Sequence, residues 1–150
     1  MTIAKGERWG EPVERPTDVR VAADDAELAR LLTDGSHIPT AVASGDLFRT
    51  LGARPLGDRD ELIAFPLDVL RVTIDDGAEL SAVAHVIAAH PRRRGGALRG
   101  EVVAVMNAQW WREFDVAPRG HPNDGRVETV ACGPDLGLRQ RWAVRSRLAT

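Results

Sequence analysis

The chain has 150 residues, of which 43% are hydrophobic, 28% charged and only 5% aromatic. This composition is typical of a globular domain and excludes intrinsic disorder and fibrous repeats. The single cysteine, Cys132, excludes an internal disulfide, which favours a reducing compartment. No apolar run approaches the ~20 residues of a membrane span, and residues 1–10 have no apolar leader. We therefore expect a cytoplasmic protein without an integral membrane segment.

The net charge of −2 is unevenly distributed. Residues 1–91 carry 9 basic and 16 acidic side chains, a net charge of −7, whereas residues 92–150 carry 11 and 6, a net charge of +5. Three consecutive arginines, 92–94, lie at the start of the basic residues 92–150. This basic part of the chain forms either a solvated surface or a face that binds a small anionic ligand. Nucleic acid is not expected as a partner, because the whole chain is slightly acidic and no aromatic residue interrupts the arginine triplet.

Residues 18–52 have the pattern of a small α/β segment that alternates strand, helix, strand and helix. Glycines and prolines interrupt the first twenty residues, which predicts a mostly loop-like stretch there. Asp24 and Glu27 have the spacing of a helix capping box, and Gly35 is a typical helix end. The expected elements are strands at 18–22 and 38–43 and helices at 24–35 and 45–52.

Residues 66–131 predict a mostly antiparallel β portion. Asp76-Gly77 is typical of a hairpin turn, and the stretch 80–89 is apolar on both faces, which predicts a central strand. A helix is expected at 136–148. We therefore expect an α+β fold in a single domain, residues 1–150, with a minimal α/β segment at 18–52 and a β lobe at 66–131. The expected strands of the lobe are 70–75, 80–89, 101–111, 116–118 and 127–131.

The first candidate site is Ser44-Gly45-Asp46, where a predicted strand ends and a predicted helix begins. Backbone N–H groups at such a junction can hold a phosphate, and a carboxylate there can position Mg²⁺ or accept a proton. The alternative is that Asp46 only caps its helix.

The second candidate site is residues 102–125, in which a very apolar strand is followed by a loop rich in hydrogen-bonding groups. The alternative is a connector of two turns held by its own side chains. A metal site is not expected, because the four histidines lack close spacing and only one cysteine is present. His85 is expected to be a core histidine, and Trp110 and Trp111 to lie in the core or on a self-association surface.

The second segment also resembles a known family. Residues 102–130, VVAVMNAQWWREFDVAPRGHPNDGRVETV, are similar to the pattern VVANG…GG…APxAxxxDGxxDVV in the C-terminal β lobe of the diacylglycerol kinase and sphingosine kinase-like lipid kinases, relatives of the NAD kinases. LDVLRVTI (67–74) and AVAHVIAAH (82–90) are similar to strands of that lobe. In AVASGDLFRTLG (41–52), Gly45 and Asp46 match the second glycine and the aspartate of the family's GGDGT motif, while Ser44, Leu47 and Phe48 differ from it.

This resemblance implies a lobe folded like the lipid-kinase C-terminal domain, and phosphoryl transfer from ATP, with Mg²⁺, to a lipid or alcohol hydroxyl. The alternative is a catalytically inactive relative that binds a small anionic ligand, a lipid or a partner. Whether a second copy of the chain completes the cleft stays open. The implied catalytic residues are Asp46, Asp115 and Asp124, and the implied cofactor-binding residues are Gly45, Asn107 and Arg119.

Overall fold

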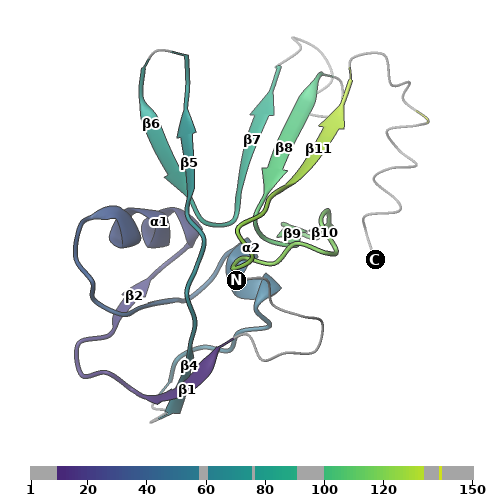
Figure 1. Cartoon of the computed structure of the whole chain (residues 1–150). Helices are drawn as coiled ribbons and strands as arrows, with labels where there is room; N and C mark the ends of the chain where they lie inside the picture. Colours follow the sequence, from purple (N-terminus) through teal and green to yellow (C-terminus); the bar gives the residue numbers. More distant parts are fainter. Residues whose placement is uncertain (1–9, 58–60, 76, 91–99, 134–138, 140–150) are drawn as a thin grey trace.

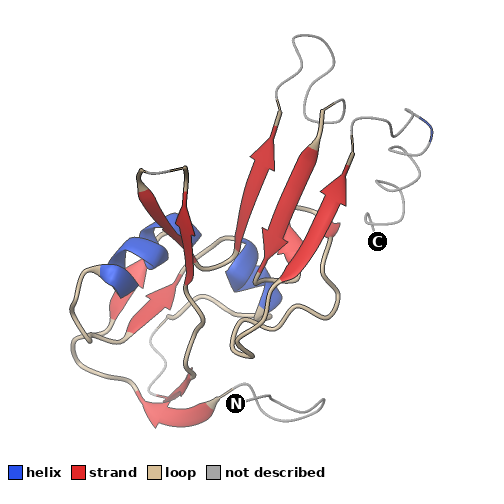
Figure 2. Ribbon diagram, turned by 45° about the horizontal axis from the view of Figure 1, so that its top comes forward, coloured by secondary structure: helices blue, strands red, loops and turns tan. Residues whose placement is uncertain are grey.

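The computed structural model describes residues 10–57, 61–75, 77–90, 100–133 and Arg139 (Figure 1). This part of the chain is α+β and mostly antiparallel, with short strands in several small sheets (Figure 2). The elements are, in chain order, β1 (Glu11–Glu14), β2 (Arg20–Ala22), α1 (Asp25–Thr33), β3 (Thr40–Val42), α2 (Asp46–Thr50), β4 (Glu61–Ala64), β5 (Leu70–Thr73), β6 (Glu79–Ala82), β7 (His85–Ala89), β8 (Val102–Met106), β9 (Trp110–Trp111), β10 (Phe114–Asp115) and β11 (Glu128–Cys132).

The predicted α/β segment is present. β2 and β3 pair in parallel, with Val21 opposite Ala41, and α1 connects them. The capping box holds the start of α1, because Asp24 Oδ1 accepts the Glu27 N–H at 2.8 Å while the Glu27 carboxylate accepts the Ala23 N–H at 2.7 Å. The four elements expected over residues 18–52 are thus confirmed, each with shorter bounds.

The loop expected over the first twenty residues is wrong for Glu11–Glu14, which form the strand β1. This strand pairs antiparallel with β4, and Val13 lies opposite Leu62. The two strands form a separate arm, at the bottom of Figure 1. Pro12 is compatible with β1, because a strand at a sheet edge has one side free of ladder hydrogen bonds. The arm depends on pairing between distant segments, which local sequence patterns do not report.

The single central strand expected at 80–89 is also wrong. β6 pairs with β5, whereas β7 pairs with β8 in a different sheet of order β11–β8–β7. The chain changes sheets at Val83-Ala84, where the Ala84 carbonyl accepts the N–H groups of Asn107 and Ala108 at 2.8 and 2.9 Å. β8 is therefore the central strand, and β7 is an edge strand, of which Ile87 packs against the buried residues of β8 while Ala88 and Ala89 are exposed.

The expected strand 101–111 ends at Met106, and its second half becomes the short β9–β10 pair. Residues 116–118 are not a strand, because Val116 and Ala117 both donate their N–H to the Gln109 carbonyl, at 3.1 and 3.0 Å. The strand expected at 127–131 is present as β11. The helix expected at 136–148 lies outside the described residues, apart from Arg139, as does the arginine triplet 92–94.

Two groups of buried apolar residues hold the chain together. One lies on β8 and beside β10, and includes Met106 and Val116. The other combines residues from both predicted parts and so joins the α/β segment to the β lobe. Its members are Ala22, Leu28, Ala29, Leu47, Val83, Ala84 and Ala108.

Candidate functional site

The first candidate site lies where β3 leads into α2, and Gly45 makes the turn possible. Its φ is +114°, in the region that side chains other than glycine rarely adopt. A Cβ at this position would also collide with the carboxylate of Asp25. The close approach of α1 to this turn therefore requires a glycine.

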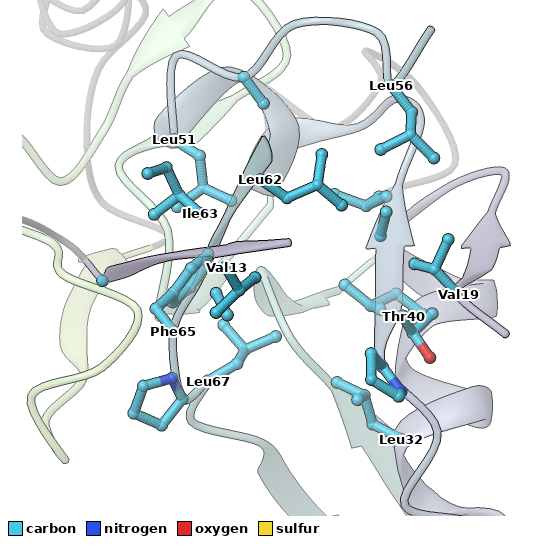
Figure 3. Close-up of a pocket in the computed structure, with 18 of the residues that line it drawn as sticks. Val13, Val19, Leu32, Thr40, Leu51, Leu56, Leu62, Ile63, Phe65 and Leu67 are labelled. Atoms are coloured by element: carbon cyan, nitrogen blue, oxygen red, sulfur yellow. The ribbon is translucent and has the colours of Figure 1, made fainter. Parts of the chain in front are cut away.

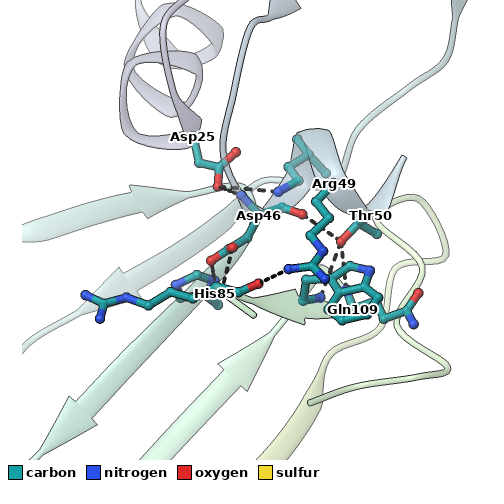
Figure 4. A network of polar contacts seen from close by, with 9 residues as sticks. Asp25, Asp46, Arg49, Thr50, His85 and Gln109 are labelled. Carbon is teal, nitrogen blue, oxygen red and sulfur yellow. Dashed lines mark hydrogen bonds and ion pairs between the residues drawn. The ribbon is translucent and has the colours of Figure 1, made fainter. Parts of the chain in front are cut away.

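Asp25 occupies the amide groups at the start of α2. Its Oδ2 accepts the N–H of Asp46 at 2.8 Å and that of Leu47 at 3.4 Å (Figure 4). Leu47 itself is a core residue, only 1% exposed. The backbone N–H groups beside Gly45, where the resemblance implies a phosphate, are thus hydrogen-bonded to a carboxylate from α1.

Burial raises the pKa of Asp25 above its usual value of 3.8. The hydrogen bonds from the N–H groups of Asp46 and Leu47 lower this pKa, but by less than burial raises it. As pH rises, Asp25 ionises in the unfolded chain before it ionises in the folded chain. The neutral carboxyl therefore stabilises the folded chain fully below pH 3.8, and this stabilisation is lost as pH rises through the pKa of Asp25 in the folded chain. The side chain is therefore a source of pH-dependent stability.

We expect Asp25→Asn, which keeps an acceptor oxygen, to gain stability relative to the parent chain as pH rises from 3.5 to 7 in urea unfolding series. Asp25→Ala is the comparison, since it leaves the N–H groups of Asp46 and Leu47 without a partner and is expected to be destabilised throughout. A stability difference between Asp25→Asn and the parent that stays constant with pH would contradict the assignment.

Asp46 connects α2 to two other elements. Its Oδ1 accepts the N–H of Arg112 at 2.7 Å, and its Oδ2 lies 3.6 Å from Nδ1 of His85 on β7. The Asp46 and His85 side chains are only 17% and 20% exposed. From the sequence, His85 is expected to be a histidine of the apolar core. It instead faces the Asp46 carboxylate. The helix-capping interpretation of Asp46 is wrong, because the Asp46 carboxylate makes no capping hydrogen bond to the N–H groups at the start of α2.

The next turn of α2 holds β9. Thr50 donates its hydroxyl to the Asp46 carbonyl at 2.8 Å and accepts the N–H of Gln109 at 3.1 Å. The Arg49 guanidinium lies 3.7 Å from the ring centre of Trp110 and donates to the Arg112 carbonyl at 2.7 Å. Arg112 has a positive φ of 54°, held by these contacts at both its N–H and its carbonyl.

Asn107, implied to bind cofactor, is 1% exposed. Its Nδ2 donates to the carbonyls of Asp68 and Val83 at 3.0 and 2.8 Å. These two carbonyls belong to the segment before β5 and to the break between β6 and β7. Asn107 therefore joins three segments of backbone, and both hydrogens of its amide are used inside the protein.

A separate network around Asp68 holds the loop that contains Asp124. The Asp68 carboxylate accepts the Gly125 N–H at 2.7 Å, and Asp124 Oδ1 accepts the Arg126 N–H at 2.9 Å. Burial, and then the negative charge of Asp124, raises the pKa of Glu128 above its usual value. The Asp124 contact agrees with the alternative interpretation of this segment as a connector held by its own side chains, whereas the Asp68 carboxylate belongs to another segment.

The six implied site residues are therefore only partly brought together. Gly45 and Asp46 lie in one network, and Asp115 lies on β10, which follows the Arg112 turn that Asp46 contacts. No contact within the described residues joins Asp124 or the exposed Arg119 to Asp46. The described part of the chain also contains no group of three histidine, cysteine or acidic side chains that could hold a metal ion.

The chain also has a large apolar cavity, of about 1180 Å³, between the β1–β4 arm and the elements α1, β3 and α2 (Figure 3). Its volume is slightly above the roughly 300–1,000 Å³ of typical small-molecule sites. Leu28 and Leu47 form a buried wall, whereas Ile63 is 57% exposed at the outside. Among the described lining residues, the only titratable side chains are His37 and Arg54.

Sequence patterns did not identify Asp25, the cavity or the Asp46–His85 contact. The acidic pair Asp24-Asp25 at the start of a helix gives little indication of the role of Asp25, because Asp24 alone accounts for the helix cap. The cavity depends on the β1–β4 arm, and neither of its strands was expected.

Comparison of the chain with protein-family models, curated proteins and solved structures found no match in any of the three. None of the helices in the described residues combines the length and apolar character needed to cross a membrane.

Proposed function

We propose that this chain is a catalytically inactive binding module that takes a small apolar molecule into the cavity beneath the β1–β4 arm. The observation that carries the proposal is the cavity itself, with its aliphatic lining and its volume of about 1180 Å³. Apolar surface of this extent is open to water without a ligand, and covering it is favourable.

The contacts of Asp25 support the absence of catalysis. Phosphoryl transfer relies on positioning and on neutralising the charge of the phosphates. At the turn before α2, a carboxylate already accepts the N–H groups of Asp46 and Leu47, so a phosphate there would meet negative charge, and these two amides are not free to bind it. Leu47 brings a buried side chain where the GGDGT motif has a glycine.

The test is binding of N-phenyl-1-naphthylamine, a neutral apolar fluorophore, to the full chain. We expect its emission to rise on binding, and we expect Ala64→Trp to weaken binding at least tenfold, because Ala64 lines the cavity and an indole there would occupy part of the space that the probe needs. Ala88→Trp, at an exposed position of β7 outside the cavity, is the control and should bind as the parent chain does.

Thermal unfolding of both tryptophan variants checks that each is folded. An emission increase that is equally strong in Ala64→Trp would place the probe elsewhere and contradict the proposal. The absence of any emission increase with the parent chain would also contradict the proposal.

Lipid kinase activity is the second candidate, and one observation favours it. Asp46 is a mostly buried carboxylate whose Oδ2 lies 3.6 Å from a histidine, between α2 and the β lobe. A carboxylate between two parts of a protein can accept a proton from a substrate hydroxyl. This candidate requires Mg²⁺-dependent nucleotide binding that depends on Asp46.

A further inference from the structure

We infer that the ligand of the apolar cavity is a long-chain carboxylate, whose head group is held by Arg54 and whose hydrocarbon chain lies against the half-buried aliphatic side chains of the lining. This inference rests on the proposed function, because it names the class of molecule that the same cavity takes.

The charge of the lining points to an anionic head group. Arg54 and His37 are the only titratable side chains among the described residues that line the cavity, so none of these lining residues is acidic. Both are exposed, so they lie where the cavity meets solvent. Arg54 makes no hydrogen bond or ion pair within the described part of the chain. A guanidinium matches the two oxygens of a carboxylate in a planar, bidentate pair.

The rest of the lining points to a hydrocarbon chain. Leu28 and Leu47 are 3% and 1% exposed and form the inner wall, so a ligand would contact mainly the half-buried apolar residues in front of them. Figure 3 shows the side chains of Val13, Leu62 and Phe65 directed toward the same space from the β1–β4 arm. A buried apolar wall with a basic rim fits a molecule that is apolar along its length and anionic at one end.

The test is a calorimetric titration of the full chain with decanoate, dodecanoate and tetradecanoate below their micelle concentrations, and with the three alcohols of the same lengths. We expect the carboxylate Kd to fall about fourfold for each added methylene. We expect each alcohol to bind at least fivefold more weakly than its carboxylate. Arg54→Gln should bring the two to equal affinity, whereas Arg71→Gln, at an exposed position of β5, is the control and should change neither.

The outcomes separate this inference from the proposed function. Equal binding of carboxylates and alcohols to the parent chain would overturn the anionic head group and leave an apolar ligand in place. An Arg54→Gln variant that retains the full preference for carboxylate would overturn the role of Arg54. Absence of binding by every compound would overturn both proposals. A dimer in sedimentation that dissociates in Ala64→Trp would mean that a second copy of the chain covers the cavity, which also overturns both.

Discussion

Replacement of Gly45 by alanine is expected to destabilise the chain by about 2–4 kcal/mol. The φ of +114° is strained for any residue with a Cβ, and the new methyl group would collide with the Asp25 carboxylate. Displacement of that carboxylate leaves the N–H groups of Asp46 and Leu47 without their acceptor. Urea unfolding at pH 7 measures the change.

Gly35→Ala is the matched control. Gly35 also has a positive φ, +80°, but a Cβ there would meet nothing within 4 Å. The backbone strain alone is expected to cost about 1 kcal/mol at this position. If the two variants lose equal stability, the contact between Gly45 and Asp25 does not contribute and the description of this turn is wrong.

Replacement of Asn107 by leucine is expected to cost about 2–4 kcal/mol, although the two side chains have the same number and branching of heavy atoms. The Nδ2 hydrogens of Asn107 satisfy the carbonyls of Asp68 and Val83 in the interior, and leucine leaves both without a donor. Removal of Asn107 Oδ1, which is buried without a hydrogen-bond partner, offsets part of this loss. Chemical unfolding again gives the difference.

Gln109→Leu makes the same exchange of an amide for an apolar side chain two residues away. The hydrogen bonds of Gln109 in the described structure use its backbone, so its replacement is expected to change stability by less than about 0.5 kcal/mol. A loss in Asn107→Leu no larger than that in Gln109→Leu would show that Asn107 does not hold the three segments together.

The sequence patterns predicted the local parts of this fold and failed on its long-range parts. The capping box of Asp24 and Glu27 and the alternation in β5 are set by neighbouring residues, and both were found. The β1–β4 arm pairs residues about fifty positions apart, and β1 contains a proline and glutamates, so neither periodicity nor composition indicates it. The apolar stretch 80–89 has a continuous pattern, but Asn107 and Ala108 divide it by binding the Ala84 carbonyl.

The candidate site was predicted in the same partial way. Gly45 and Asp46 were identified because a strand-to-helix turn and its glycine are local features. The role of Asp25 was not, because its side chain reaches across 21 positions to the Asp46 N–H. Asn107 and Asp124 were identified as polar residues after a buried strand, but the same pattern describes a polar connector, and hydrogen-bond geometry alone separates the two.

The most direct test of the account is a calorimetric titration of the full chain with ATP, in the presence and absence of Mg²⁺, beside the Asp46→Asn variant. Asparagine keeps an oxygen to accept the Arg112 N–H, so the variant is expected to fold. Because the Asp25 carboxylate accepts the N–H groups of Asp46 and Leu47, we predict no binding heat at millimolar nucleotide. Mg²⁺-dependent binding that Asp46→Asn abolishes would contradict this prediction and favour phosphoryl transfer.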